Sequence, residues 1–149
     1  MTKLTAIIIA IFLSVSLYGQ APVLFSYKIK KEVDRKYKIQ IIADVDEGWH
    51  IYSQTQPTDA IATPTSLQFT TNPLIALEGR PEEVGQKELY KNEQLNVSQY
   101  QYSGRVAFIQ TVIIKGNARV TMTCTITYQA CTNERCLPPA KLPISISLP

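Results

Sequence analysis

Residue types that mark common enzyme classes are scarce in this sequence. It has one histidine and three cysteines among 149 residues, and it shows no nucleophile motif of a hydrolase. Two neighbouring thiols and one remote histidine fall short of the four ligands of a typical zinc site, so we expect no metal and no cofactor. The excess of positive over negative charge is also small. A formal net charge of +3 is too small to indicate nucleic acid or an anionic membrane as a partner.

Long hydrophobic runs are missing after the start of the chain. Leu4–Val15 is almost entirely apolar and follows a short positive start at Lys3, but it is shorter than the ~20 residues of a membrane-spanning helix. This pattern predicts a secretory signal peptide over residues 1–19, with a membrane anchor as the alternative. The remainder, residues 20–149, is expected to be a single exported domain without a membrane span. No cysteine lies near the predicted cleavage site after Gly19, which excludes a lipid-modified N-terminal cysteine.

No segment has a convincing helical pattern, and there is no internal repeat. Alternation of apolar and polar residues recurs instead, which is typical of half-buried strands. The predicted strands cover residues 24–30, 37–45, 49–52, 67–69, 74–77, 105–114, 120–128 and 142–148. This profile predicts an all-β fold, an immunoglobulin-like β-sandwich of about eight short strands.

Some segments carry finer predictions. Residues 24–30 and 37–45 are expected to form a hairpin, and residues 105–114 a central strand buried on both sides, because both of its faces are apolar. Pro143 indicates an edge strand or a strand start. Residues 79–101 have the least regular pattern, which predicts one short helix or a long surface loop.

The strand after Gly48 is short, and its orientation follows from parity. If the alternation resumes unshifted after the break at Gly48, Trp49 and Ile51 face the core. His50 and Tyr52 are then expected to face away from it.

The three cysteines fall into two environments. Cys124 lies between Met122 and Ile126 on the apolar face of a strand, which predicts a buried and inert thiol. Cys131 and Cys136 lie past the end of that strand, where solvent access is expected. The four residues between them allow the two Cα atoms to come within disulfide distance, and an exported chain meets oxidising conditions.

A disulfide across this loop has two possible roles. A ring of six residues gives only about 2 kcal/mol of stabilisation by chain entropy, which is little for a structural bond. A short exposed bridge can be reached by a partner thiolate, and Arg135 beside Cys136 favours a thiolate. The residues alone leave open a thiol–disulfide exchange domain and a non-enzymatic binding or structural β-sandwich with an inert Cys131–Cys136 bond.

The cysteine loop and two upstream stretches resemble a known family. Tyr128-Gln129-Ala130-Cys131, four residues, and Cys136-Leu137-Pro138-Pro139 are similar to the active-site segment of the N-terminal periplasmic domains of the disulfide reductase DsbD. Asp46–Tyr52 resembles that family's Gly-aromatic-aromatic-aliphatic-Tyr strand, and Gly85–Tyr90 the segment after its cap loop. The resemblance implies a periplasmic immunoglobulin-like domain, a protein thiol:disulfide oxidoreductase whose cysteine pair cycles between disulfide and dithiol.

The resemblance also implies residue roles and partners. Cys136 would form the mixed disulfide with a partner, and Cys131 would resolve it, in a pocket that Tyr52 and His50 line. Further candidates for lining the site are Glu82, Glu83, Tyr90, Tyr128, Arg135 and Pro138. The implied partners are thioredoxin-fold proteins of the disulfide isomerase or cytochrome c maturation type, and we expect a separate membrane protein to donate the electrons.

One departure from the family concerns the cap over the cysteines. An aromatic residue in the family's cap loop shields the cysteine pair, whereas the corresponding stretch here is Pro81-Glu82-Glu83-Val84. The shield is therefore expected to be absent or to come from a different side chain.

Overall fold

The computed structural model describes residues 19, 21–70 and 72–149, so the predicted signal peptide lies outside the described residues except for Gly19. The described part of the chain forms strands and no helix, and none of it could cross a membrane as a helix. The strands are β1 (Val23–Val33), β2 (Lys36–Val45), β3 (His50–Tyr52), β4 (Ser66–Phe69), β5 (Ile75–Asn92), β6 (Val97–Ile114), β7 (Val120–Tyr128), β8 (Ala130–Cys131) and β9 (Ala140–Leu148). The predicted all-β fold is confirmed.

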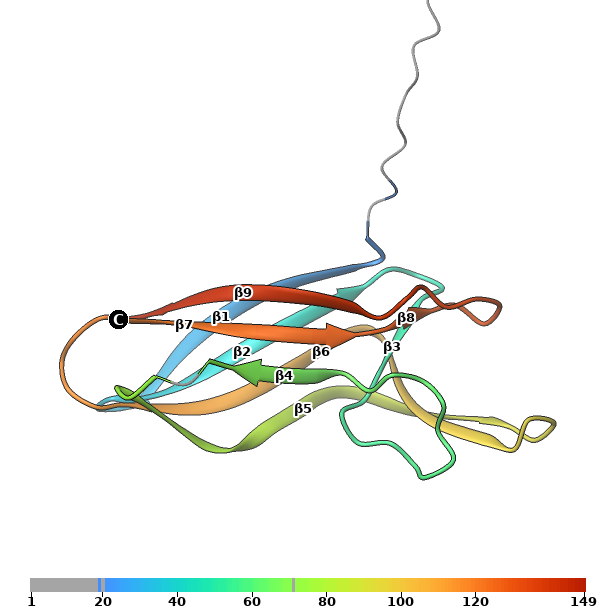
Figure 1. Ribbon diagram of the computed structural model, residues 1–149, viewed down its shortest axis with the longest axis horizontal. Helices are drawn as coiled ribbons and strands as arrows, with labels where there is room; N and C mark the ends of the chain where they lie inside the picture. Colours follow the sequence, from blue (N-terminus) through green and yellow to red (C-terminus); the bar gives the residue numbers. More distant parts are fainter. Residues whose placement is uncertain (1–18, 20, 71) are drawn as a thin grey trace, which may run out of the picture.

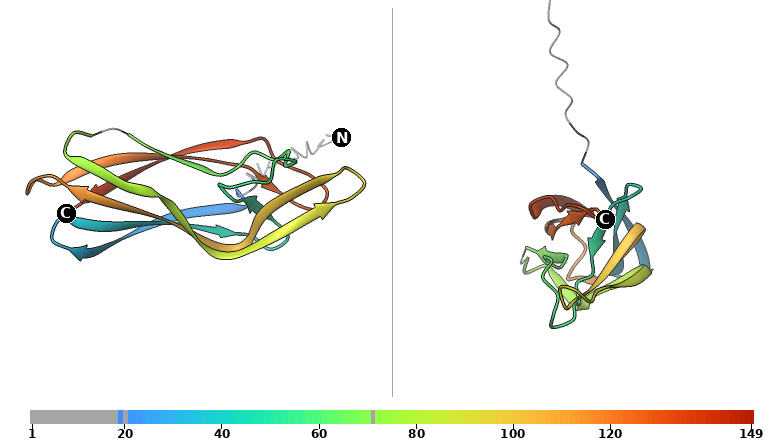
Figure 2. Two further views of the ribbon diagram at one scale, coloured as in Figure 1. Left: turned by 90° about the horizontal axis from the view of Figure 1, so that it is seen from below. Right: turned by 90° about the vertical axis from the view of Figure 1, so that its right-hand side faces the viewer.

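The strands form two sheets that pack face to face (Figures 1 and 2). The larger sheet has the order β1-β2-β6-β3-β8, with β5 also paired to β6, and the smaller sheet has the order β4-β7-β9. Ile39, Ile41 and Phe108 of the larger sheet belong to one apolar core with Ile126 and Ile146 of the smaller sheet. Burial of this shared core is what holds a β-sandwich together.

The regular strands agree with the sequence pattern. β1 and β2 pair as a hairpin, and β6 is central, because it pairs with β2, β3 and β5. β9 is an edge strand, as Pro143 indicated. The prediction that β6 is buried on both sides is wrong: Phe108 on its inner face is fully buried, whereas Ile109 on its outer face is only half-buried. Among the described residues, no second layer covers that part of the outer face of the larger sheet.

Residues 79–101 are the main correction to the predicted fold. They form neither a helix nor a loop but belong to the long antiparallel hairpin of β5 and β6. Register shifts between Glu78 and Glu82 and between Gly85 and Lys87 interrupt the alternation, which is why the sequence pattern there looks irregular.

The far half of this hairpin, residues 87–102, is called the arm below. At Gly104, whose φ is +76°, β6 stops pairing with β2, and beyond it toward the arm β6 pairs with β3. Glycine adopts such a φ without strain, which allows the strand to bend at this point. Figures 1 and 2 show that the arm and the loop after β8 project from the same end of the molecule.

Candidate functional site

Cys131 and Cys136 form a disulfide at the end where the arm projects. After β7 ends in the smaller sheet, the chain crosses to the larger sheet, where β8 pairs with β3. Residues 130–137, called the cysteine hairpin below, then turn back on themselves. Thr132 N donates to Arg135 O at 2.7 Å, and Leu137 N donates to Ala130 O at 2.9 Å. These two backbone hydrogen bonds flank the disulfide, so the backbone itself holds the two cysteines opposite each other.

The turn of the cysteine hairpin is stabilised by one side chain. Thr132 Oγ1 accepts hydrogen bonds from the backbone N–H groups of Glu134, at 3.2 Å, and Arg135, at 3.1 Å. A threonine hydroxyl that bonds its own turn in this way restricts the conformations of the turn.

The two sulfur-bearing residues differ in exposure. Cys136 is exposed, whereas Cys131 is only 1% exposed. The prediction that both are accessible to solvent is wrong for Cys131, which lies on the edge strand β8 directly opposite the buried His50 of β3. A thiolate arriving from solvent therefore meets the Cys136 sulfur.

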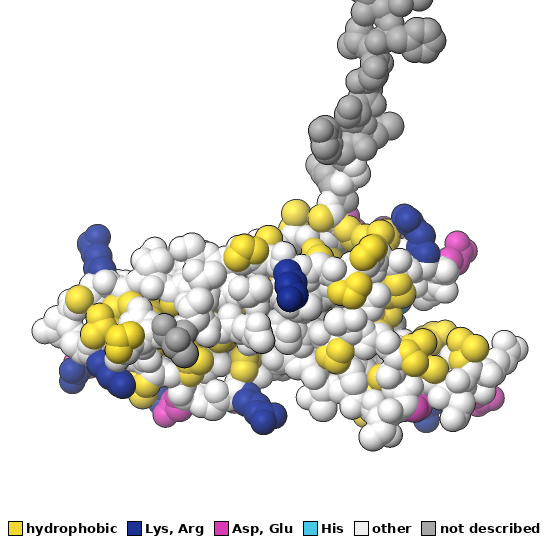
Figure 3. All heavy atoms as spheres, viewed as in Figure 1, with side chains coloured by type: hydrophobic (Ala, Val, Ile, Leu, Met, Phe, Trp, Pro, Cys, Tyr) yellow, Lys and Arg dark blue, Asp and Glu magenta, His cyan; other side chains and the backbone are white. Residues whose placement is uncertain are grey.

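A pocket of about 220 Å³ opens between the cysteine hairpin and the arm. It is lined by His50, Tyr52, Tyr90, Gln99, Gln101, Thr132, Asn133, Glu134, Arg135 and Cys136. The space-filling view shows hydrophobic side chains gathered on the lobe formed by the arm, beside the notch that separates it from the cysteine hairpin (Figure 3). Exposed apolar residues of the arm and its tip include Leu89, Tyr90 and Leu95.

Five of the predicted site residues thus surround one pocket: His50, Tyr52, Tyr90, Arg135 and Cys136. Two lining residues, Gln99 and Gln101, did not follow from the sequence analysis. Both are buried polar residues of β6, at 7% and 8% exposure. The sequence does show that the two glutamines are spaced by two, and so share one face of a strand. Buried polar side chains need hydrogen-bond partners, so such a pair can indicate a site.

His50 and Tyr52 face away from the core, as parity predicted, but both are buried. Their exposures are 7% and 2%, and His50 Nε2 lies 3.2 Å from Tyr52 Oη. They are buried because β3 is covered on both faces, by the core on one side and by the arm and the cysteine hairpin on the other. Burial lowers the pKa of His50 against an opposing effect of Glu88, and burial raises the pKa of Tyr52.

Trp49 connects the core to the cysteine hairpin. It is half-buried and packs against the core, as predicted, and the guanidinium carbon of Arg135 lies 5.2 Å from the centre of its ring. This cation–π contact holds the positive charge of Arg135 next to Cys136. The sequence contains no local signal for the contact, since the two residues are far apart in the chain.

The other predicted lining residues lie outside the pocket lining. Tyr128 packs in the core with its ring centre 4.9 Å from that of Phe25. Pro138 is exposed beyond the cysteine hairpin. Glu82 lines a separate depression on the outer face of the larger sheet with Lys36 and Lys38. The Pro81–Val84 stretch, compared above with a cap loop, is part of β5.

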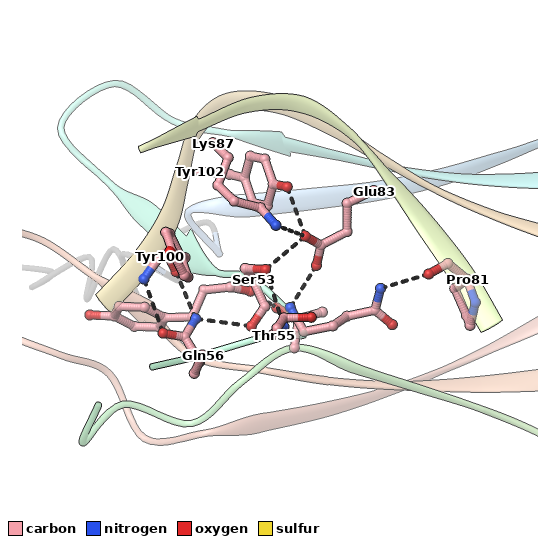
Figure 4. A network of polar contacts seen from close by, with 11 residues as sticks. Ser53, Thr55, Gln56, Pro81, Glu83, Lys87, Tyr100 and Tyr102 are labelled. Carbon is pink, nitrogen blue, oxygen red and sulfur yellow. Dashed lines mark hydrogen bonds and ion pairs between the residues drawn. The ribbon is translucent and has the colours of Figure 1, made fainter. Parts of the chain in front are cut away.

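Glu83 is engaged by a hydrogen-bond network at the base of the arm (Figure 4). Its carboxylate accepts from Ser53 Oγ at 2.7 Å, Gln54 N at 2.6 Å and Tyr102 Oη at 2.7 Å, and pairs with Lys87 at 3.1 Å. Burial acts to raise the pKa of Glu83, but these hydrogen bonds outweigh it and the pKa is lowered.

The third cysteine is separate from this chemistry. Cys124 is free and fully buried, and burial raises the pKa of its thiol to about 12. The prediction of a buried thiol is confirmed, and the raised pKa keeps it protonated at neutral pH. Within the residues that the structure describes, no group of three or more His, Cys, Asp or Glu side chains could hold a metal ion.

Comparisons with known proteins identify a family and a similar fold. The family model described as "Thiol:disulfide interchange protein DsbD, N-terminal" matches residues 19–147. Among solved structures, the reduced DsbD N-terminal domain of Neisseria meningitidis is similar with a TM-score of 0.52 at 16% identity, over 83% of this chain and 84% of that chain. The N-terminal periplasmic domain of ScsB from Proteus mirabilis has a TM-score of 0.56 at 12% identity, over 90% of this chain and 49% of that chain. No curated protein sequence gives a significant match.

Proposed function

Because this chain belongs to the family of N-terminal domains of the thiol:disulfide interchange protein DsbD, we propose that it exchanges electrons with partner proteins through Cys131 and Cys136. The unequal exposure of the two cysteines carries this proposal. Cys136 opens into the pocket, whereas Cys131 is 1% exposed. A partner therefore bonds to Cys136, and Cys131 remains inside to complete the exchange.

The exchange proceeds in two steps. In the reduced domain, the Cys136 thiolate attacks a disulfide of the partner, so that a mixed disulfide forms and one partner sulfur leaves as a thiolate. Cys131 then attacks the Cys136 sulfur, which re-forms the Cys131–Cys136 bond and releases the second partner sulfur. Two electrons and two protons pass to the partner, and the reverse sequence with a donor dithiol reduces the domain again.

Features of the site suit both the disulfide and the dithiol state of the cysteine pair. The hydrogen bonds that flank the disulfide lie in the backbone, so they hold the cysteines together after reduction as well. Arg135, held on Trp49, keeps a positive charge close to Cys136, and a nearby cation favours a thiolate. The pocket between the arm and the cysteine hairpin carries Tyr90, and aromatic side chains are enriched at protein interfaces.

The proposed electron acceptors are thioredoxin-fold proteins of the disulfide isomerase or cytochrome c maturation type, and the proposed donor is a separate membrane protein. The domain, residues 20–149, works in the periplasm after removal of the signal peptide at residues 1–19. The family assignment supports this setting, because export exposes the cysteine pair to oxidising conditions in which a disulfide relay operates.

A redox titration tests the proposed chemistry directly. The purified protein is equilibrated with glutathione or thioredoxin buffers, and the fraction of Cys131–Cys136 disulfide is measured by thiol alkylation and mass spectrometry. We expect a reduction potential above about −300 mV, the range of exchangeable bonds. A potential below that value would show an inert bond and support the competing function, a structural or binding β-sandwich.

Trapping of the mixed disulfide tests the assigned roles. Cys131→Ser is expected to accumulate a covalent complex with a thioredoxin-fold partner through Cys136, because the resolving thiol is missing. Cys136→Ser is the matched variant and is expected to trap none. Accumulation with Cys136→Ser instead, seen on a non-reducing gel, would reverse the two roles.

A further inference from the structure

The buried position of Cys131 raises a question about its proton. To attack Cys136 in the mixed disulfide, Cys131 must lose the proton of its thiol, because the thiolate is the nucleophile. At 1% exposure, the thiol has almost no contact with solvent that could take this proton. An acceptor inside the protein is therefore needed.

His50 is the group best placed for this purpose. In the pairing of β3 with β8, His50 lies directly opposite Cys131. Residues opposite each other in antiparallel strands share one face of the sheet, with Cβ atoms about 5 Å apart. His50 also lines the pocket into which Cys136 opens. His50 therefore lies on the same face of the sheet as Cys131 and also borders the pocket that is open to solvent.

The ring of His50 is held in a defined orientation. Its Nε2 lies 3.2 Å from Tyr52 Oη, and the two rings stand edge to face with centres 5.4 Å apart. Tyr52 is itself 2% exposed, so the pair is fixed by packing. A fixed acceptor next to a thiol is the arrangement that general base catalysis requires.

We propose that His50 accepts the proton of Cys131 when Cys131 attacks Cys136 in the mixed disulfide, and that Tyr52 orients the ring. The inference rests on the proposed exchange function and adds a catalytic residue to it. The proton moves from Cys131 Sγ to the imidazole, and the electron pair left on sulfur forms the bond to Cys136. The partner sulfur leaves with the electron pair of the mixed disulfide and takes a proton from the imidazolium through the pocket.

Burial and the charges around His50 together determine whether its ring is neutral, and so able to accept a proton, at neutral pH. The titratable groups near it are Asp46 and Glu47 after β2, Tyr52 of β3, Glu88 and Tyr90 of β5, and Cys131, Glu134, Arg135 and Cys136 of the cysteine hairpin. The β6 residues near it, Gln99, Gln101, Ser103 and Gly104, carry no charge. Burial lowers the pKa of His50 and outweighs Glu88, so the ring is neutral at neutral pH and free to accept.

The reaction with dithionitrobenzoate separates the two exchange steps in one stopped-flow trace. Attack by Cys136 on this aromatic disulfide releases a first coloured thiolate, and resolution by Cys131 releases a second. In the native protein we expect the second phase to reach a plateau above the lowered pKa of His50 and to slow as the pH falls through it. In His50→Gln, which cannot titrate, we expect the second phase to slow by about a hundredfold at neutral pH. We also expect its rate to keep rising with pH, as the thiol alone ionises.

The first phase serves as the internal control. It reports attack by the exposed Cys136, a step in which His50 is given no proton to accept, so the ratio of the two phases isolates the resolving step. Near-ultraviolet circular dichroism checks that the variant is folded. In His50→Ala, added imidazole should partly restore the second phase, which a purely structural role of His50 would not allow.

The outcomes separate this inference from the function on which it rests. A second phase with the same rate and pH profile in His50→Gln would overturn the role of His50 and leave the exchange function intact. A slower second phase that keeps the native pH profile would reduce His50 to a structural residue. Absence of a second phase from the native protein would instead contradict the exchange function itself.

Discussion

Among single residues, Glu83 shows how a buried carboxylate positions the arm. Its side chain is 8% exposed and joins three segments: the loop after β3 through Ser53 and Gln54, β6 through Tyr102, and β5 through Lys87. A buried charge with this many donors is stable only while all of them are in place. Glu83 thus stabilises the base of the arm that forms one wall of the pocket.

Replacement of Glu83 by Gln should lower the free energy of unfolding by about 2 kcal/mol at neutral pH, because the amide loses charge-assisted hydrogen bonds. The folded-state pKa of Glu83 is lowered, so its contribution is present above the ordinary pKa of a carboxyl group. That contribution disappears as the pH falls through the lowered pKa. The difference between variant and native protein, measured by urea unfolding, should therefore shrink in acid.

Glu82→Gln provides the matched control for this change. Glu82 is the exposed neighbour of Glu83 on the outer face of the sheet, so its replacement should change the stability by less than about 0.5 kcal/mol. Equal effects of the two substitutions would contradict the importance of the Glu83 network.

Among structural elements, the cysteine hairpin determines how readily the disulfide forms. Its backbone hydrogen bonds and the Thr132 hydroxyl restrain the turn whether or not the sulfurs are joined. In the oxidised state the covalent bond also restrains the turn, whereas in the reduced state these hydrogen bonds act alone. The conformation of the reduced hairpin thus sets the effective concentration of one thiol at the other.

Thr132→Val keeps the shape of the side chain but removes its hydroxyl from the turn. The reduced hairpin should gain conformational freedom, which favours the dithiol by about 0.5–1 kcal/mol. The reduction potential should then become less negative by roughly 10–20 mV, as measured in glutathione buffers. Thr125→Val on β7 is the control and should leave the potential unchanged; a shift of the same size in that variant would show that the effect does not come from the turn.

In the whole molecule, stability and chemistry are carried by different regions. The apolar core lies between the two sheets, and the cysteine hairpin contributes to it only through Ala130 and the partly buried Leu137. Cys131 is buried at its pairing with β3 without being part of this core. The domain should therefore tolerate repeated opening and closing of its disulfide.

Reduction of the disulfide should leave the fold intact. The expected loss is about 2 kcal/mol of unfolding free energy, the chain-entropy value for so small a ring. Urea unfolding of the native protein and of the double variant Cys131→Ala/Cys136→Ala measures this loss, and near-ultraviolet circular dichroism reports the packing. Loss of the near-ultraviolet signal on reduction would show that the disulfide is needed for the fold, and it would rule out the relay.

The sequence by itself determined the scaffold and set Cys131 and Cys136 apart from Cys124. Alternating residues such as Val120, Met122 and Ile126 predicted the strands, because a strand with one buried face must repeat with a period of two. The same parity separated Cys124 from Cys131 and Cys136. These features are local, so a single segment is enough to show them.

Only the tertiary structure decided which of the two cysteines is exposed and what surrounds them. The burial of Cys131, His50 and Tyr52 depends on the arm and the cysteine hairpin, which lie far from β3 in the chain and cover its outer face. Period-two alternation predicts that one face of a strand is buried and the other exposed. The predicted exposure is wrong where a distant segment covers the second face. The strands of the arm were missed for a related reason, since the register shifts near Glu82 and Gly85 interrupt the alternation that would reveal them.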